Sequence, residues 1–456
     1  MTTISPAHKY FSAGLAGAVE NMTTSPGAVR AVTEDCLVLI RAREPALRSM
    51  VHVDEQGALA QADKLDTLLA EGSEPLPLHG IPVVIKEIYS IDGMPDSSGS
   101  KLPTPELFEP EGKVMHDLRS AGCVILGKSF SVEFAFGQFN LDRTMPVNPC
   151  ARQGDTPEDR ATGGSSSGSA AAQAAGYCGF AMGTDTGGSV RLPAALCGVV
   201  GFKPSEGSLD TGGIFTLSAQ LDTPGFFCNS VTDAALIFDS LGGKADVFSA
   251  EVDEFCIGIP SGDLVNRVDS EVAAAWSGTL QQLESTGVSF IEIDMPSLET
   301  AGQYFAKSLP VELLNYLGRE YVIENQSLLD QVTHARLQPF LDGPPVVFQP
   351  NDFGEIRQEA LSCLAAAGVD CWMIPTVPCV APLLSELENL EAVADWQGYV
   401  SRNTRYTSLL GHAAISLPLP DDLAGLMPVA VQISAPAGRD QALLQAATRI
   451  ESLLDC

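Results

Sequence analysis

One segment, residues 163–191, constrains the fold of this chain more than any other. It opens with seven consecutive glycine and serine residues, continues through an alanine-rich run, and ends in a second glycine-serine turn. Ser165 and Ser189 each follow a pair of glycines, and they lie 24 positions apart. Glycine lets the backbone turn sharply and approach a ligand closely. The connection is long enough for one helix and one strand, so it could bring the two hydroxyls together. This pattern suggests a serine nucleophile and a helper.

Helix-like and strand-like segments alternate along the chain, which favours a layered α/β fold. Alanine is the strongest helix former, so residues 170–175 predict a helix between the two turns. The apolar run 180–185 predicts a short strand before the second turn. The other strand candidates are residues 83–85, 123–127, 197–202, 371–375 and 429–433, and the other helix candidates are 55–71, 265–290 and 440–454. Pro193 is well placed as the first residue of a helix after the second turn.

The composition is that of a folded, acidic protein. Of the 456 residues, 45% are hydrophobic and 18% are charged, which is ample for a large core and unlike a disordered chain. The net charge is −31, from 57 acidic and 26 basic side chains. A field of this sign repels phosphate backbones and anionic membranes, so we expect neither nucleic acid nor a membrane as a partner.

Three features predict a cytoplasmic protein. The eleven cysteines are scattered without a Cys-x-x-Cys pair, which is typical of reduced, buried thiols. The N-terminus lacks the basic and apolar regions of a signal peptide. No run of 18 apolar residues is present that could span a membrane.

Residues 163–169 have other interpretations, and their context weakens each of them. A flexible linker would suit the Gly/Ser composition, but the loop runs directly into a helix-forming segment. A phosphate-binding loop needs a lysine after its last glycine, whereas Ser169 follows Gly168. The dinucleotide pattern G-x-G-x-x-G is missing here, and so is the G-x-S-x-G nucleophile elbow around Ser189.

A serine nucleophile needs a base. The six histidines are His8, His52, His79, His116, His334 and His412. None lies in a context that marks a catalytic triad, although triad partners meet only in space. The alternative base is Lys86, which follows the apolar run 83–85. Its pKa would have to fall by roughly 3 units, about 4 kcal/mol, and burial can supply such a shift. Glu87 would point to the opposite face of the strand. A solvated lysine is the other interpretation.

Several long motifs, in the same order, resemble those of the amidase signature family. The sequence has His-Gly-Ile-Pro-Val-Val-Ile-Lys over residues 79–86, Gly-Gly-Ser-Ser-Ser-Gly-Ser over 163–169, Gly-Thr-Asp-Thr-Gly-Gly-Ser-Val-Arg-Leu-Pro over 183–193, Cys-Gly-Val-Val-Gly-Phe-Lys-Pro over 197–204, and Leu-Asp-Thr-Pro-Gly over 221–225. The strong resemblance covers about residues 50–235, and a weaker one covers about 370–455. The spacing of the two serines is also that of the family.

The resemblance assigns catalytic roles. It implies that Ser189 is the acyl-forming nucleophile and that Ser165, held in a cis peptide, relays the proton to Lys86. The oxyanion hole would consist of the backbone N–H groups of Thr186, Gly187, Gly188 and Ser189. A glycine-rich turn agrees with this role, because its amides are free to point at one spot where a developing oxyanion is stabilised. Asp185 and Arg191 are expected to brace the turn.

The resemblance also implies the architecture. The amidase-signature fold would have a large mixed, mostly parallel central sheet covered by helices on both faces. It would be a single domain over residues 1–456, with an N-terminal helical segment (about 1–72), a signature core (about 76–235) and a variable substrate-shaping region (about 240–410). Four aromatic residues are candidates for an apolar pocket, with ordinary packing as the alternative: Phe134, Phe136, Tyr316 and Trp396.

The expected function is hydrolysis of a small-molecule amide to an acid and ammonia or an amine, without a metal or organic cofactor. A homodimer is compatible with this expectation. Two alternatives stay open: a transamidation component like that of the amidotransferases, working with other protein partners and a tRNA, and a non-catalytic scaffold of the same fold. Glu87, Ile88 and Ser167 depart from the family pattern. None carries a proposed catalytic atom, so they bear on substrate and loop geometry rather than on reaction class.

Overall fold

The computed structural model describes residues 8–152, 158–243, 256–295, 299–343 and 353–454. Its central feature is one eleven-stranded sheet with the strand order β1-β3-β2-β4-β6-β5-β10-β11-β9-β7-β8. The strands are β1 (Met50–Val53), β2 (Pro82–Lys86), β3 (Val124–Ser129), β4 (Phe180–Asp185), β5 (Val200–Lys203), β6 (Thr223–Cys228), β7 (Cys256–Pro260), β8 (Ser289–Ile293), β9 (Cys371–Pro375), β10 (Ala413–Pro418) and β11 (Ala430–Ala435).

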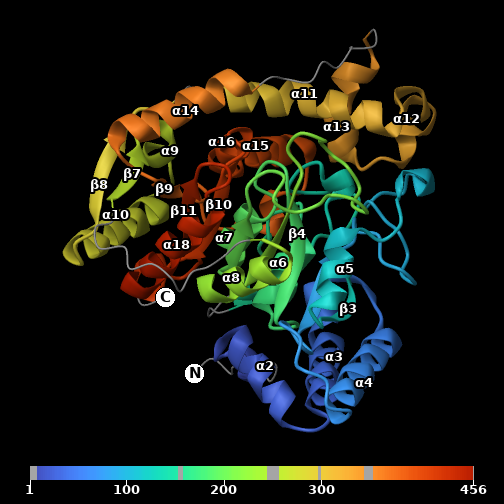
Figure 1. Cartoon of the computed structure of the whole chain (residues 1–456). Helices are drawn as coiled ribbons and strands as arrows, with labels where there is room; N and C mark the ends of the chain where they lie inside the picture. The colour runs from blue at the N-terminus through green and yellow to red at the C-terminus, as the bar shows by residue number, and fades with distance from the viewer. Residues whose placement is uncertain (1–7, 153–157, 244–255, 296–298, 344–352, 455–456) are drawn as a thin grey trace.

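Helices surround this sheet (Figure 1). In the described ranges the α-helices are α1 (His8–Phe11), α2 (Gly14–Thr24), α3 (Ala28–Leu47), α4 (Glu55–Ala70), α5 (Lys113–Ser120), α6 (Ser167–Ala174), α7 (Arg191–Cys197), α8 (Val231–Ser240), α9 (Asp263–Asn266), α10 (Ser270–Ser285), α11 (Glu299–Leu317), α12 (Arg319–Asn325), α13 (Gln331–Leu341), α14 (Gly354–Ala367), α15 (Leu390–Val400), α16 (Arg402–Leu409), α17 (Asp421–Ala424) and α18 (Asp440–Leu454). The α/β class predicted from the alternating pattern is confirmed.

The prediction of a mostly parallel sheet is wrong. Strand β2 runs parallel to β3 and β4, and β7 runs parallel to β8 and β9, but the other neighbours in the sheet are antiparallel. The prediction followed from the resemblance to the amidase signature family. The unbroken apolar runs of the strands do not test it, because they report only that both faces of a strand are buried. Here antiparallel strands are buried on both faces as well, so the runs carry no information about strand direction.

Helices cover both faces of the sheet, as expected. Every residue of β4, β6 and β11 is buried, and successive side chains of a strand point to opposite faces. Helices α6 and α7 pack against each other and against β4 and β5, respectively. Helices α8 and α18 form a second pair, which packs against β6 and β10. The serine turns, which flank α6 and β4, therefore lie in the interior of the layered core.

Most predicted elements near the serine turns are confirmed, and one boundary is wrong. Strand β4 and helices α6 and α18 form where the sequence predicts them. The predicted strand over residues 197–202 begins only at Val200, because α7 continues to Cys197 and Gly198 ends it in the left-handed conformation with φ of 66°. Glycine is the preferred residue for this kind of helix end. Pro193 is the third residue of α7 rather than the first.

The helices beyond the sheet form a wall next to the serine turns. In Figure 1, α11, α13 and α14 run along one side of the molecule, whereas α2, α3 and α4 lie at the β3 end. Helix α11 packs against α13 and α16, and α13 also packs against α15. These contacts bring residues from the second half of the chain to the turns at 163–169 and 186–189.

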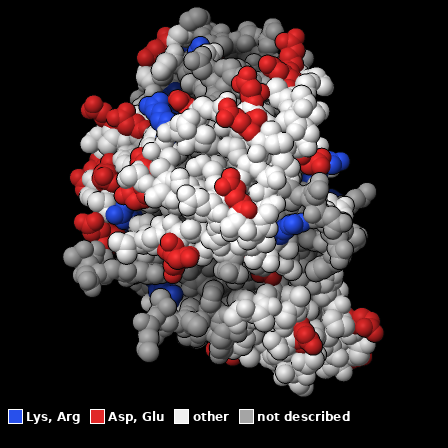
Figure 2. All heavy atoms as spheres, turned by 90° about the vertical axis from the view of Figure 1, so that its left-hand side faces the viewer, with Lys and Arg blue, Asp and Glu red and all other residues white. Residues whose placement is uncertain are grey.

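The surface is acidic, in agreement with the net charge. On the face shown in Figure 2, acidic side chains predominate over basic ones. Among the described helices, none combines the length and the apolar character needed to cross a membrane.

Candidate active site

Lys86 and Ser165 are in direct contact. Lys86 is the last residue of β2 and is completely buried. Its Nζ lies 2.8 Å from Ser165 Oγ and 2.8 Å from Thr184 Oγ1. Strands β2 and β4 are parallel neighbours, so their carboxyl ends meet at one edge, which explains why Thr184 reaches Lys86. The resemblance implied that Ser165 passes a proton to Lys86, and the two side chains are in contact.

The surroundings of Lys86 favour a neutral amine. Burial lowers the pKa of Lys86 from 10.5 to about 7, against the opposing effect of the carboxylates of Asp222, Asp185 and Glu87. The Glu87 carboxylate itself is used elsewhere, because it accepts from the Ser131 N–H at 2.6 Å and forms an ion pair with Arg143 at 3.0 Å. A substantial fraction of the amine is therefore free to accept a proton at neutral pH.

The first serine turn is held tightly by its neighbours. The Gly164–Ser165 peptide bond is cis, as the resemblance implied. The Ser165 carbonyl accepts from the Val132 N–H at 3.0 Å, and the Ser166 N–H donates to the Ser189 carbonyl at 3.4 Å. A Cβ at Gly164 would lie 2.6 Å from the Gln138 carbonyl oxygen, so no larger residue fits. The two turns are thus placed side by side, as their spacing suggested.

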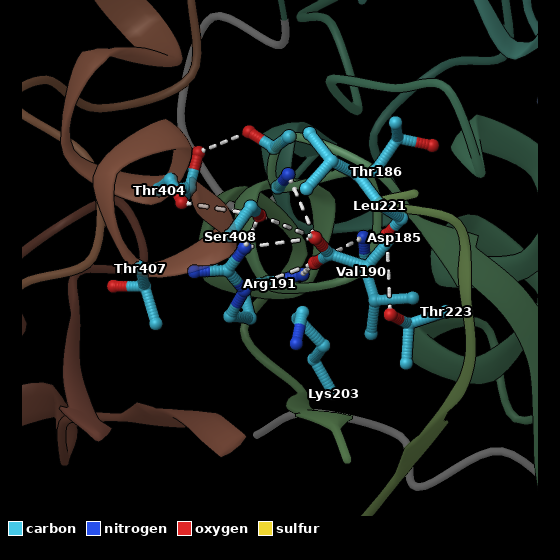
Figure 3. A network of polar contacts seen from close by, with 12 residues as sticks. Asp185, Thr186, Val190, Arg191, Lys203, Leu221, Thr223, Thr404, Thr407 and Ser408 are labelled. Carbon is cyan, nitrogen blue, oxygen red and sulfur yellow. Dashed lines mark hydrogen bonds and ion pairs between the residues drawn. The ribbon is translucent and has the colours of Figure 1, made fainter. Parts of the chain in front are cut away.

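Asp185 and Arg191 brace the second turn, as expected (Figure 3). The Asp185 carboxylate forms two hydrogen bonds with the Arg191 guanidinium, at 2.8 and 2.9 Å, and accepts from the Val190 N–H at 3.2 Å. Although burial opposes it, Arg191 lowers the pKa of Asp185 from 3.8 to about 2. Arg191 also donates to Ser408 Oγ and to Gln432 Oε1, each at 2.7 Å. This buried ion pair ties the turn to α16 and β11.

One of the four predicted oxyanion donors is engaged elsewhere. The Gly188 N–H donates to Asp185 Oδ1 at 2.8 Å and so does not point at a substrate. Within the described residues, no acceptor takes a hydrogen bond from the N–H groups of Thr186, Gly187 or Ser189. The Gly187 carbonyl accepts from Thr404 Oγ1 at 2.8 Å, which fixes the orientation of its peptide (Figure 3). The turn therefore offers three amides rather than four.

A small cavity opens to solvent at the second turn. Its lining residues are Ala135, Gly137, Gln138, Thr186, Gly187, Ser189, Leu217, Phe305, Leu309, Arg336 and Arg405. The aromatic and aliphatic side chains of Phe305, Leu309 and Leu217 make part of the wall apolar, and Arg336 and Arg405 make another part cationic.

The four aromatic residues proposed for the pocket do not line this cavity. Phe134 stacks on Phe215 with ring centroids 5.5 Å apart, and Tyr316 makes an edge contact with the same ring. Trp396 packs near Tyr399, and Phe136 lies beneath the Arg336 guanidinium. Ordinary packing, the alternative interpretation, is therefore the better one. Sequence reasoning missed Phe305, Arg336 and Arg405, which lie in no recognisable motif.

All three departures from the family pattern lie at buried positions. Ile88 is a core residue, and Ser167 is the first residue of α6. The Ser167 hydroxyl is buried and has no hydrogen-bond partner among the described residues. Nothing in the structure explains why serine stands at this position.

His412, one of two buried histidines, is not arranged as a base for either serine. His412 Nδ1 lies 3.3 Å from Trp372 Nε1, and burial lowers the pKa of His412 to about 3. Within the described residues, no group of three or more His, Cys, Asp or Glu side chains is arranged to hold a metal ion.

Several known proteins are similar to this chain over most of its length. The sequence model of the family described as Amidase matches residues 31–444. A 2-amino-5-chloromuconic acid deaminase of Comamonas testosteroni is 31% identical over 426 residues, 90% of this chain and 89% of that protein. A component of the glutamyl-tRNA(Gln) amidotransferase of Desulfotalea psychrophila is 34% identical over 335 residues, 68% of each chain. A crystal structure of an amidase superposes with a TM-score of 0.79 at 28% identity, covering 96% of this chain and 98% of the other. This chain belongs to the amidase family, whose members carry the amidase signature.

Proposed function

We propose that this protein hydrolyses a carboxylic amide through an acyl-enzyme on Ser189, with Ser165 and Lys86 as the proton relay. The observation that carries the proposal is the contact between the buried Lys86 amine and Ser165 Oγ at 2.8 Å, in a turn that is hydrogen-bonded to Ser189. An activated serine needs a base within hydrogen-bond reach, directly or through a second group.

In the first half-reaction, Ser189 Oγ attacks the amide carbonyl carbon. The Ser189 proton passes to Ser165, and the Ser165 proton passes to the neutral Lys86 amine. The developing oxyanion is stabilised by the N–H groups of Thr186, Gly187 and Ser189. The C–N bond then breaks, and the relay returns its proton to the leaving nitrogen. Ammonia or an amine departs, and the acyl group stays on Ser189.

In the second half-reaction, water replaces the amine. It gives its proton to the same relay while its oxygen attacks the acyl carbon, and the same three amides stabilise the charge. Collapse of this intermediate releases the acid and restores the Ser189 hydroxyl. No cofactor is consumed in these steps.

The test is labelling of the protein with a fluorophosphonate probe, combined with a screen of small amides for ammonia release. We expect Ser189→Ala to abolish both labelling and turnover, and Ser165→Ala and Lys86→Ala to lower turnover severely. The control is Ser285→Ala, at an exposed position of α10 far from the turn in sequence. A Ser189→Ala protein that keeps near-full turnover would refute the assignment. A wild-type protein that neither labels nor hydrolyses would favour a non-catalytic scaffold.

The similarity to an amidotransferase component supports a second candidate, in which the protein supplies ammonia to partner proteins. Relatives of both kinds match most of this chain, 90% for the deaminase and 96% for an amidotransferase component of Roseobacter denitrificans, so the choice between the two candidates rests on the charge of the chain and on its partners. The net charge of −31 also opposes direct contact with a tRNA. Isolation from its native cells distinguishes the two, because a transamidation component would co-purify with stoichiometric partner proteins.

A further inference from the structure

The cavity at Ser189 contains a pair of arginines that have no acidic partner. Arg336 comes from α13 and Arg405 comes from α16, and both line the same cavity as Ser189. Among the described residues, no carboxylate forms a salt bridge or hydrogen bond with either guanidinium. Both residues are half-buried.

Each guanidinium is held in place but keeps unused donors. Arg336 donates to the Phe136 carbonyl, and its Cζ lies 3.4 Å from the centroid of the Phe136 ring. Arg405 donates to the Gln397 carbonyl at 3.5 Å, and its Cζ lies 5.6 Å from the centroid of the Phe305 ring. A guanidinium carries more N–H donors than these contacts use. The remaining donors are available to a ligand.

This arrangement is electrostatically unfavourable unless an anion joins it. Burial and, to a smaller extent, the charge of Arg405 together lower the pKa of Arg336 to about 9. Burial alone lowers the pKa of Arg405 to about 10. Arg191 and Arg143 have carboxylate partners, Asp185 and Glu87, whereas Arg319 is held by backbone carbonyls alone among the described contacts. The chain has 57 acidic side chains, yet these two neighbouring arginines, Arg336 and Arg405, have no carboxylate partner among the described residues. This arrangement indicates that a ligand supplies the negative charge.

Building on the proposed hydrolysis at Ser189, we infer that the substrate is an amide that also carries a carboxylate, which Arg336 and Arg405 bind. Arginine suits this ligand because its planar fork matches the two oxygens of a carboxylate. Phe305 and Leu309, in the same wall, would contact the carbon chain between the amide and the carboxylate. The protein would therefore convert the monoamide of a small dicarboxylic acid into the dicarboxylate.

The first test compares matched substrates. Malonamate, succinamate and glutaramate are each paired with the neutral amide of the same chain length, namely propanamide, butanamide and pentanamide. At least one monoamide is expected to exceed its neutral counterpart in kcat/KM by roughly tenfold to a hundredfold, the usual worth of hydrogen bonds to a charged group. Neutral amides that react as well as all three monoamides would overturn the inference while leaving the amidase proposal intact.

The second test assigns the effect to the arginines. Arg336→Met and Arg405→Met are each expected to lower the preference for the monoamide roughly tenfold, mainly through KM, because the carboxylate is bound in both ground state and transition state. Arg41→Gln removes a positive charge from a surface pair with Glu55 and should leave the preference unchanged. An unchanged preference in both methionine variants would overturn the assignment.

The third test measures binding without chemistry. Titration calorimetry of the preferred monoamide into Ser189→Ala should show binding that is weakened roughly tenfold when Arg405→Met or Arg336→Met is added. Inorganic phosphate serves as a competing anion, and stronger competition by phosphate than by succinate would refute a carboxylate subsite. If the wild-type protein neither reacts with a fluorophosphonate nor hydrolyses any amide, the proposed function fails; if only the carboxylate preference is absent, the inference alone fails.

Discussion

At the scale of single residues, the proposed proton relay depends on a buried lysine. Burial brings the pKa of Lys86 to about 7, which suits a base that works near neutral pH. The same burial opposes folding while the amine is charged, because a buried charge loses its hydration. The burial that suits Lys86 to act as a base therefore also lowers the stability of the folded protein.

We predict that kcat/KM rises with pH and levels off above an apparent pKa near 7, since only the neutral amine accepts a proton. The Asp222 carboxylate favours the charged amine, so Asp222→Asn should shift the profile to lower pH. In the folded state the pKa of Lys86 lies below its ordinary value of 10.5, so its charge opposes folding fully below about pH 7, and this penalty fades as the pH rises toward 10.5.

Lys86→Met should thus be inactive but more stable than the wild type by about 2 kcal/mol at pH 7, after allowance for two lost hydrogen bonds. Denaturant unfolding at pH 7 and pH 9.5 measures the difference, which should be smaller at the higher pH. A rate profile that is flat between pH 5 and 8, or a Lys86→Met protein of reduced stability at pH 7, would contradict this account.

The charge of Asp185 stabilises the folded state, unlike that of Lys86, because the Arg191 guanidinium compensates it. Asp185→Asn leaves the Arg191 guanidinium buried and unpaired, so we expect a loss of about 3–5 kcal/mol of unfolding free energy. The pKa of Asp185 lies near 2 against an ordinary 3.8, so the wild-type contribution is present above pH 3.8 and is lost as the pH falls through about 2. The surface pair of Asp370 and Arg439 provides the control, since Asp370→Asn should change stability by less than about 1 kcal/mol. Equal effects of the two substitutions would contradict the bracing role.

At the scale of elements, the second turn is shaped by its contact with α16. Gly188 has a φ of 121°, and a Cβ there would lie 2.0 Å from Thr404 Oγ1. The same glycine directs its N–H to Asp185. Position 188 therefore requires glycine for two reasons: the positive φ of its backbone and the close approach of α16.

Gly188→Ala is expected to lower the unfolding free energy by more than about 2 kcal/mol, because backbone strain and a steric clash act together. It should also lower kcat, since it displaces the amides of Gly187 and Ser189. The matched control is Gly207→Ala, which has a φ of 76° and no atom within 4 Å of the added Cβ; its cost should be about 1 kcal/mol. Chemical denaturation measures the unfolding free energy of both variants, and steady-state kinetics measures their kcat. A smaller effect at Gly188 than at Gly207 would show that α16 does not constrain the turn.

Local sequence patterns predicted some features of the helices and strands and not others. The alanine run and the apolar run correctly predicted α6 and β4, because helix propensity and apolar burial are local properties. Strand direction was not predictable, because β10 and β11 are as buried as parallel strands would be. The end of α7 at Gly198 could have been found from the glycine itself, which marks a helix C-terminus.

At the scale of the whole molecule, the sheet and the outer helices have different tasks. The sheet brings the carboxyl ends of β2 and β4 together and so joins Lys86 to the serine turns. The helices α11, α13 and α16 close the space above Ser189 and supply Phe305, Arg336 and Arg405. The residues proposed to carry out the reaction therefore lie in the core, and the residues proposed to select a carboxylate lie on the outer helices. The surface of the protein is acidic, whereas Arg336 and Arg405 make this part of the cavity wall cationic.

The sequence by itself determined the family, the two serine turns, Lys86 as the proposed base and the bracing pair Asp185 and Arg191. These follow from short motifs whose residues act on near neighbours in the chain or at one strand edge. Only the tertiary structure decided the direction of the strands, the loss of Gly188 as an oxyanion donor, and the cationic wall of the cavity. Arg336 and Arg405 lie 147 and 216 positions after Ser189. Their meeting depends on the packing of separate helices, which no local pattern records.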